Sequence, residues 1–303
     1  MAEARSISLR WRPPFALDAL ATLRPLWQGP GDAQTRIAGN VVARASRTPV
    51  GPASLRIEIG RGELVATAWG PGAEWAIEAL PDLLGARDDP AQLVPRHKLL
   101  ADLLRRHPGL RLTRSGRVLE ALLPAIISQK VTGLEARRSY RQLLAEWGEP
   151  APGPLGLRLL PPPETLAAQP YWLFHPLGLE QRRADVVRAA AGAASRLERI
   201  VELSPADGRR HLLAVPGIGP WTAAETMRVA LGDPDAVSVG DYHIPNMVSW
   251  ALAGEPRGDD ARMLELLEPY AGQRARVVQL LEAGGLVPPR YGPRLAARAI
   301  RDI

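Results

Sequence analysis

The chain has 303 residues, of which 46% are hydrophobic and 23% charged, a balance typical of a folded protein with two or three packed units. The absence of cysteine excludes disulfides, thiolate zinc sites and cysteine-ligated iron–sulfur clusters. No charge-free apolar run of about 18 residues occurs and no signal peptide is recognisable, so we expect a cytoplasmic protein without a membrane partner. The net charge of +6 favours a polyanionic partner such as nucleic acid, although a genomic base bias gives the same arginine-rich composition.

Residues 1–90 combine strand and helix patterns. Alternating polarity, or an apolar run after a glycine turn, predicts strands over residues 7–11, 55–59 and 64–69. Helical spacing of apolar residues predicts helices over residues 15–23 and 73–80. We therefore predict a small α+β domain over residues 1–90, which ends in a linker at residues 85–90.

Helical periodicity dominates residues 91–303. Residues 118–147 predict either two helices or one long broken helix, and residues 150–163 are too rich in proline for a helix and should cross the surface. Further helices are predicted over residues 163–168, 182–197, 205–214, 221–231, 244–253, 261–267 and 273–283. The predicted fold class is therefore mainly α, with a helical region behind the α+β domain.

The most informative stretch is the sequence HLLAVPGIGPWTAAE over residues 211–225. One helix should end at the Pro-Gly-Ile-Gly turn, and a second should begin near Pro220, because proline suits the first helical turn. Gly217 and Gly219 can adopt positive φ, and their backbone N–H groups can converge with those of the second helix on a DNA phosphate. Ile218 would pack back between the two helices. A plain helix–turn–helix corner with glycine caps is the alternative.

Five segments in order resemble the helix-hairpin-helix DNA glycosylase superfamily, and within it the 3-methyladenine DNA glycosylase II family. They are residues 9–15 (LRWRPPF), 121–131 with the string ISQKV, 177–184 (LGLEQRRA), the hairpin, and 237–244 (VSVGDYHI). The resemblance implies a TBP-like α+β N-terminal domain and two helical subdomains with a DNA cleft between them. It further implies a bacterial, nucleoid-associated repair enzyme that acts as a monomer on double-stranded DNA containing damaged bases.

Asp241 follows the hairpin by about one helix and one loop, and the resemblance places its carboxylate beside the sugar of an everted nucleotide. An enzyme that acts on a base must flip that base out of the duplex. Breaking the N-glycosidic bond develops oxocarbenium charge on the sugar, which a fixed carboxylate stabilises. The alternative role of Asp241 is to cap a helix that begins near Tyr242 or His243, and the two roles can coexist.

An N-alkylated purine is cationic and favours a pocket with aromatic faces. Trp221 is the leading candidate for this base pocket and Tyr242 a weaker one, whereas a core position for Trp221 is the alternative. Glu225 lies four residues after Trp221 on the same helix face, so it should line the pocket or else turn outward to pair with Arg228. Residues 275–281 have no aromatic where the family carries a tryptophan, so the pocket should be less aromatic and more anionic.

The resemblance also implies a set of residues that contact the duplex: Gln129, Lys130, Gly217, Ile218, Gly219 and Thr222. Gln129 and Lys130 fall where the family fills the hole left by the everted base, although Lys130 can instead contact a phosphate or remain solvated. No cofactor is implied apart from a structural monovalent cation, Na+ or K+, held by the backbone carbonyls of Leu213, Val215 and Ile218. The five histidines have no spacing typical of a metal site.

We therefore predict a glycosylase that hydrolytically releases damaged purines, with alkylated cationic purines as the expected substrates. In lyase members of the superfamily the position of Trp221 holds a nucleophilic lysine, so the resemblance implies a monofunctional enzyme. One alternative is a glycosylase for deaminated or oxidised bases. Another is a non-catalytic protein that keeps the hairpin only to hold DNA, against which the presence of Asp241 argues. A sequence-specific regulator would need a second helix-turn-helix, which the sequence lacks.

Overall fold

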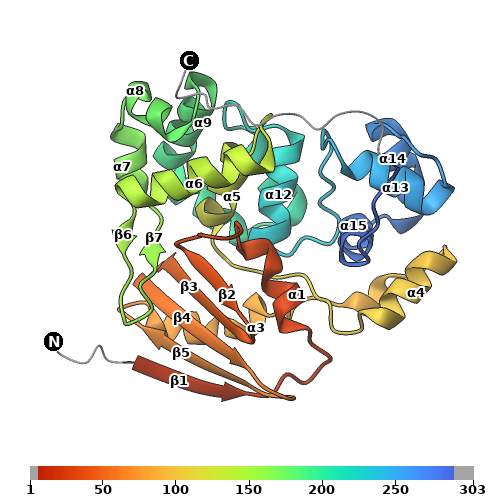
Figure 1. Cartoon of the computed structure of the whole chain (residues 1–303), viewed down its shortest axis with the longest axis horizontal. Helices are drawn as coiled ribbons and strands as arrows, with labels where there is room; N and C mark the ends of the chain where they lie inside the picture. The colour runs from red at the N-terminus through yellow and green to blue at the C-terminus, as the bar shows by residue number, and fades with distance from the viewer. Residues whose placement is uncertain (1–5, 290–303) are drawn as a thin grey trace.

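The computed structural model describes residues 6–289, in which a sheet at the beginning of the chain is followed by helices (Figure 1). The sheet is antiparallel, in the order β1-β5-β4-β3-β2. Its strands are β1 (Ser6–Trp11), β2 (Thr35–Ala38), β3 (Val41–Thr48), β4 (Gly51–Ile59) and β5 (Leu64–Trp69). The predicted strands are confirmed as β1, β4 and β5. The sequence pattern misses β2 and β3, because β3 alternates small alanines with the polar Arg44 and Ser46.

Three short helices accompany the sheet: α1 (Ala19–Leu23), α2 (Ala73–Glu78) and α3 (Leu80–Leu83). α2 packs on β1, β4 and β5, and apolar side chains of the sheet and these helices form one core. The prediction of a helix over residues 15–23 is wrong at its start. Asp18 accepts a hydrogen bond from the Ala21 N–H at 3.0 Å, which caps a helix that begins only at Ala19.

A second core lies among the central helices. They are α5 (Val118–Ile127), α6 (Gly133–Trp147), α7 (Pro163–Ala168), α8 (Tyr171–Phe174), α9 (Gln181–Gly192), α10 (Ala194–Glu198), α11 (Pro205–Leu213) and α12 (Pro220–Ala230). Residues 118–147 thus form two helices, since Thr132 and Glu135 make a capping box at the start of α6. The helix predicted over residues 182–197 is wrong as a single element, because Ala193 separates α9 from α10.

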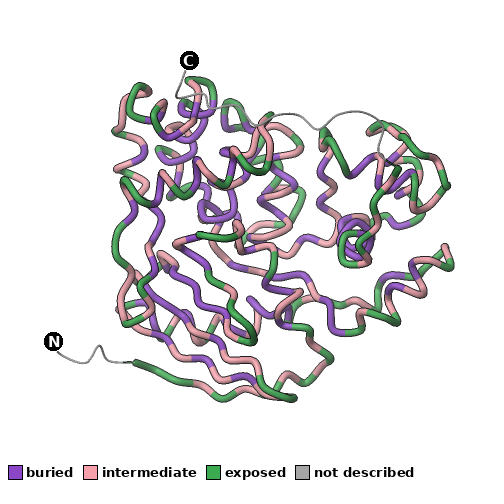
Figure 2. Tube along the Cα trace, in the orientation of Figure 1, coloured by how far each residue is buried: buried purple, intermediate pink, exposed green. Residues whose placement is uncertain are grey.

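A third core joins two distant parts of the chain. α4 (Lys98–Arg106), which the sequence pattern does not predict, packs with α13 (Ile244–Ala253), α14 (Asp260–Leu267) and α15 (Arg274–Ala283). Figure 2 shows the buried segments of α4, α13 and α15 that contribute to this core. The helices α7 and α11–α15 are confirmed to within one residue at each end. The described helical region therefore has two cores, one around α5–α12 and one around α4 and α13–α15.

Residues 150–163 form more than the plain surface crossing that their prolines predict. β6 (Glu149–Pro150) and β7 (Arg158–Leu159) pair as a short ribbon. Leu157 and Leu159 are buried against alanines of β3, because these leucines give the segment an apolar face. Within residues 6–289, no helix has the length and apolar character needed to cross a membrane.

Candidate active site and nucleic-acid interface

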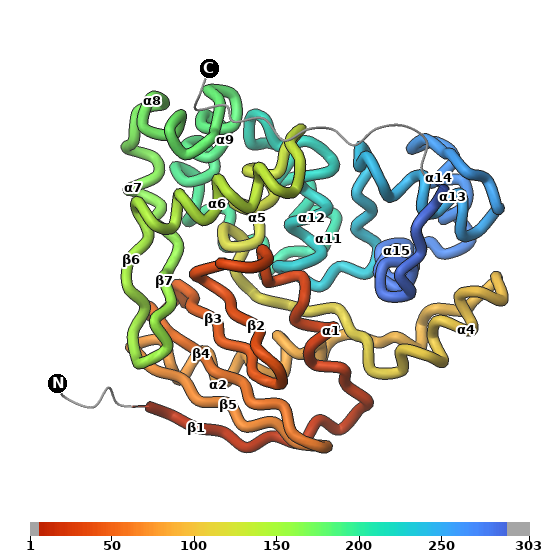
Figure 3. The backbone as a smooth tube through the Cα atoms, viewed as in Figure 1, coloured from red at the N-terminus to blue at the C-terminus, as the bar shows by residue number. Residues whose placement is uncertain are grey.

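The hairpin connects α11 to α12, which pack against each other (Figure 3). Gly217 has a φ of 85°, and a Cβ at this position would lie 2.1 Å from Val186 Cγ2 of α9, so the packing requires glycine. Gly219 differs, because its φ is −96° and an added Cβ would meet no atom within 4 Å. The expectation of positive φ at both glycines is therefore wrong for Gly219. Its missing side chain instead leaves open space at the start of α12.

Backbone N–H groups of the hairpin are available to an anion. Over the described range, the Gly217 and Gly219 N–H groups donate to no protein acceptor, and the first N–H groups of any α-helix lack partners within the helix. A helix N-terminus also attracts negative charge. Ile218 is buried in the central core, as expected, so the turn presents its backbone rather than an apolar side chain.

The carbonyl oxygens expected to hold a monovalent cation have free lone pairs. In the part of the chain that the structure describes, no N–H donates to the carbonyls of Leu213 and Ile218. The Val215 carbonyl accepts one hydrogen bond, from the Ile218 N–H at 3.1 Å, which leaves it a second lone pair. The three oxygens fit the implied Na+ or K+, whose binding stays a prediction. The described residues contain no cluster of three acidic or histidine side chains that could hold another metal ion.

Asp241 lies in the loop before α13, and its two carboxylate oxygens have different partners. Oδ1 accepts hydrogen bonds from the backbone N–H groups of His243 (2.7 Å) and Ile244 (2.9 Å), which caps α13. Oδ2 accepts a hydrogen bond from Trp221 Nε1 at 2.9 Å. The capping role is therefore present, and the carboxylate is held from both sides. A carboxylate fixed in this way is suited to stabilise positive charge that develops next to it.

Trp221 and Glu225 line one cavity of about 160 Å³. Its walls come from α5, α6, α12 and the N-terminal domain. Tyr242, the third expected pocket residue, is not among the lining residues: the residue is 75% exposed and its ring stands edge-on to that of His243 at 4.9 Å. The structure thus brings Trp221 and Glu225 into one cavity with Asp241 bonded to Trp221, and leaves Tyr242 at the surface.

Glu225 occupies both positions that the sequence leaves open, since it lines the cavity and also pairs with Arg228. Its Oε2 accepts a hydrogen bond from Arg228 Nη2 at 3.0 Å, and its Oε1 accepts one from the Ser238 hydroxyl. Arg228 Nη1 also donates to Glu282 Oε2, at 3.1 Å. Glu225 raises the pKa of Arg228, burial lowers it and Glu282 raises it again, with a net rise that keeps the guanidinium charged.

Sequence reasoning does not identify Ser238 and Glu282 as site residues, and it treats Arg228 only as an outward partner of Glu225. The spacing of Glu225 and Arg228 is a readable signal, because residues three apart on a helix are neighbours. Glu282 comes from α15, which is remote in sequence, and only its hydrogen bond to Arg228 in the folded chain reveals it.

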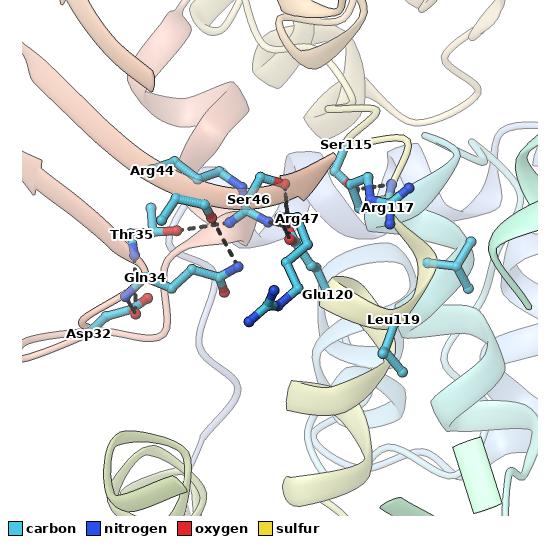
Figure 4. A network of polar contacts seen from close by, with 12 residues as sticks. Asp32, Gln34, Thr35, Arg44, Ser46, Arg47, Ser115, Arg117, Leu119 and Glu120 are labelled. Carbon is cyan, nitrogen blue, oxygen red and sulfur yellow. Dashed lines mark hydrogen bonds and ion pairs between the residues drawn. The ribbon is translucent and has the colours of Figure 1, made fainter. Parts of the chain in front are cut away.

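One wall of the cavity is polar and belongs to the interface between the sheet and α5 (Figure 4). Arg44 donates from Nη2 to Glu120 Oε2 and from Nη1 to Thr35 Oγ1, each at 2.8 Å. Ser46 and the Arg47 backbone N–H donate to the same Glu120 carboxylate. The Arg44 and Glu120 side chains are 9% and 4% exposed, so the pair is buried and fully hydrogen-bonded, and it fixes β3 against α5.

Gln129 and Lys130 lie in the turn between α5 and α6 and have different surroundings. Gln129 Nε2 donates to the Gly217 carbonyl at 3.1 Å and to Thr222 Oγ1 at 2.8 Å, so this side chain ties the turn to the hairpin. Thr222 is buried, so it supports the hairpin through this hydrogen bond, and its expected contact with the duplex stays a prediction. Lys130 is exposed and has a φ of 55°, the one positive value outside glycine over residues 6–289. Such strain is concentrated at functional sites.

α9 supports both of these loops from behind. Arg183 of α9 has a side chain only 2% exposed and donates to the carbonyl of Ile127, the last residue of α5, at 2.7 Å. Val186 of the same helix packs against Gly217. One helix therefore sets the position of the α5–α6 turn and of the hairpin relative to each other.

Comparison with solved structures defines the class of fold. The 3-methyladenine DNA glycosylase of Archaeoglobus fulgidus matches 90% of this chain and 97% of its own, with a TM-score of 0.76 and 19% identity. The 8-oxoguanine glycosylase/lyase of Clostridium acetobutylicum, solved with double-stranded DNA, matches 93% of this chain and 96% of its own, with a TM-score of 0.69 and 16% identity. The chain has the fold of these glycosylases, which confirms the predicted fold class.

Two curated relatives give a more particular likeness. A probable bifunctional transcriptional activator/DNA repair enzyme AlkA of Mycobacterium tuberculosis is 30% identical over 167 residues, 54% of this chain and 31% of its own length. A putative DNA-3-methyladenine glycosylase, YfjP of Bacillus subtilis, is 25% identical over 178 residues, 56% of this chain and 61% of its own. The chain spans less than two thirds of each relative, and no protein-family model matches it. The resemblance to helix-hairpin-helix and 3-methyladenine glycosylases is confirmed.

Proposed function

We propose that this protein is a monofunctional DNA glycosylase that everts a damaged purine from duplex DNA and hydrolyses its N-glycosidic bond. The observation that carries the proposal is the fixed Asp241 carboxylate, which is bonded to Trp221 one helix after an anion-receptive hairpin. The names of the relatives support the same activity. We further propose that the enzyme acts as a monomer on chromosomal DNA in the bacterial nucleoid.

The hairpin provides the hold on the duplex. Its free N–H groups at Gly217 and Gly219 bind a backbone phosphate without reading sequence. A bound phosphate anchors the strand while the damaged nucleotide rotates out of the stack, at a cost that is smallest for a damaged base. Lys130, which projects from a strained turn tied to the hairpin, occupies the space that the base leaves.

Asp241 then promotes cleavage electrostatically. The bond between the sugar C1′ and the purine nitrogen breaks, and its electron pair leaves with the base. The sugar ring gains oxocarbenium charge, which the Asp241 carboxylate stabilises. Water adds to C1′ and loses a proton. The Trp221 indole and the N–H groups at the start of α13 hold the carboxylate in place, so it needs no rearrangement during the step.

The charge of the pocket favours an alkylated, cationic purine. Such a base is a good leaving group, and both an aromatic face and a carboxylate attract it. Trp221 supplies the aromatic face, while Glu225 and Glu282 share the single guanidinium of Arg228, which leaves an excess of negative charge. The lysines of the chain, Lys98 and Lys130, lie outside the cavity, so a lysine Schiff base has no candidate there.

An Asp241→Asn variant tests the assignment. It should bind an undamaged duplex normally and lose at least about two orders of magnitude in single-turnover base release, because it lacks the stabilising charge. Asp260→Asn is the matched control, since Asp260 holds the same loop through the Gly240 N–H at 3.0 Å. Near-normal release by Asp241→Asn, or an equal loss in the control, would overturn the role of the charge.

The same experiment separates the alternatives when it uses a panel of single-lesion duplexes. Release of alkylated purines alone supports the proposal, whereas release of only deaminated or oxidised bases would shift the substrate class. No release by the wild-type protein, with duplex binding intact, would leave a non-catalytic DNA-binding protein. Borohydride treatment with an abasic duplex should trap no covalent complex, and a trapped complex would contradict monofunctional chemistry.

A further inference from the structure

Arg228 holds two carboxylates that differ in how many free acceptor positions they keep. Both oxygens of Glu225 are engaged, one by Arg228 and one by the Ser238 hydroxyl, and its side chain is 21% exposed. Glu282 uses only Oε2, through Arg228 Nη1 at 3.1 Å, and its side chain is 43% exposed. Within the described residues, Glu282 Oε1 has no hydrogen-bond donor. Glu282 is therefore the carboxylate of this pair that still has an oxygen free for a ligand.

The position of Glu282 relative to the cleavage site follows from α12. Trp221, Glu225 and Arg228 succeed one another along this helix and line the same cavity. Asp241 is bonded to the first of them and Glu282 to the last. The charge of Asp241 is also close enough to Glu282 to raise the pKa of its carboxyl group. A base everted beside Asp241 therefore enters the field of a second, partly exposed carboxylate.

We propose that Glu282 is a specificity-determining residue, whose Arg228-held carboxylate selects positively charged bases over neutral ones of similar shape. This inference rests on the glycosylase activity proposed above. Arg228 fixes the Glu282 carboxylate. Its single positive charge balances only one of the two glutamates that it bonds, so the cluster of Arg228, Glu225 and Glu282 has a net negative charge. An opposite charge on the base strengthens binding through space, whereas a neutral base gains nothing from it. Selection by charge thus takes the place of selection by additional aromatic faces.

The test compares single-turnover release of 7-methylguanine, which is cationic, with that of hypoxanthine, which is neutral. Glu282→Gln keeps the length of the side chain and an acceptor for Arg228 but removes the charge. It should slow release of 7-methylguanine about fivefold, as expected for a partly exposed charge pair, and leave hypoxanthine unchanged. Glu265→Gln on the surface of α14, where Glu265 pairs with Arg262 and is 69% exposed, is the matched control and should change neither rate.

The outcomes distinguish this inference from the proposed function. An equal effect of Glu282→Gln on both lesions, or no effect on either, while the wild-type protein releases both, would overturn the role of Glu282 alone. No release of any base by the wild-type protein would overturn the glycosylase activity and the inference with it. A loss of 7-methylguanine release in Glu282→Gln that is smaller in Glu282→Asp would support selection by charge, because the aspartate keeps the negative charge on a shorter side chain.

Discussion

The hairpin and the base cavity adjoin each other at α12, but they are built by different means. The hairpin uses backbone N–H groups and carbonyls, and Val215 and Ile218 anchor it in the central core. The cavity end of the site uses side-chain charge: Glu225 and Glu282 both bond the guanidinium of Arg228, and Asp241 is bonded to Trp221. Under the proposed function, the hairpin would hold a duplex of any sequence and the cavity would select the base. Holding the duplex and choosing the lesion would then be separate properties of the two ends of one site.

Substitution of the two hairpin glycines should produce the largest and most unequal effects. Gly217→Val places a Cβ within 2.1 Å of Val186 at a φ of 85°, and should lower the free energy of unfolding by about 3 kcal/mol or more. Gly219→Asn meets open space at ordinary φ and supplies an N-cap side chain, so stability should hold. Its amide oxygen competes with phosphate for the same N–H groups, so duplex affinity should fall about tenfold.

Thermal unfolding and duplex titrations at fixed salt check this pair of variants. The loss of affinity in Gly219→Asn should be the same for every sequence, because a phosphate contact carries no sequence information. A loss confined to one sequence, or equal destabilisation by the two substitutions, would contradict the distinction between a packing glycine and an open one.

The difference between hairpin and cavity also explains why the sequence predicts the hairpin better than the cavity. The hairpin is formed by residues that are close together in sequence, so the spacing of Pro216, Gly217 and Gly219 predicts both helices and the turn between them. Even there, the sequence does not distinguish Gly217 from Gly219, because the close approach of Val186 comes from α9. The same limit applies to the fold: most of the longer helices are predictable from their apolar spacing, whereas α4 and β3 are missed, and Arg44 of β3 finds its partner Glu120 only in the packed structure.

The cavity is less predictable because its charges come together from separate helices. Trp221 is predicted as the aromatic residue at the start of the second hairpin helix, and Glu225 is predicted from its position four residues later on the same helix face. Glu282 is not, since it meets Arg228 of α12 only in the folded chain. Tyr242 shows the opposite error, because its place next to Asp241 in sequence suggests a pocket residue, whereas its side chain points into solvent. Adjacency in sequence is a poor guide where a loop turns between helices.

Substitutions of Gln129 and Lys130, neighbours in the α5–α6 turn, should have different effects, both of intermediate size. Gln129→Ala removes two hydrogen bonds to the hairpin, so it should lower thermal stability and duplex affinity together. Lys130→Gly relieves the strain of a φ of 55° and should raise stability slightly, yet slow base release about tenfold, because no side chain then fills the vacated space.

Fluorescence of 2-aminopurine placed beside the lesion reports base eversion in these variants, and thermal unfolding reports stability. Lys130→Gly should reduce the eversion signal while Gln129→Ala leaves the fraction everted per bound duplex unchanged. The reverse pattern would assign the filling role to Gln129 and the supporting role to Lys130.

The smallest expected effect concerns pH, and it should distinguish the cavity from the hairpin directly. Burial raises the pKa of Glu282; Arg228 lowers it, whereas the carboxylates of Glu225 and Asp241 raise it further. Because the pKa is raised, Glu282 loses its charge, as pH falls, before an ordinary glutamate with a pKa of about 4.3 does so. The preference for 7-methylguanine over hypoxanthine should then decline toward the Glu282→Gln value, by about fivefold, as the pH falls from neutral, and the decline should begin above the pH range in which an ordinary glutamate is protonated. The ratio of the two single-turnover rates at saturating enzyme isolates this effect, since any change common to both lesions cancels. Gly219→Asn should show the same decline as the wild-type protein, whereas Glu282→Gln should show a flat ratio, and a decline that persists in Glu282→Gln would assign the titration to another group.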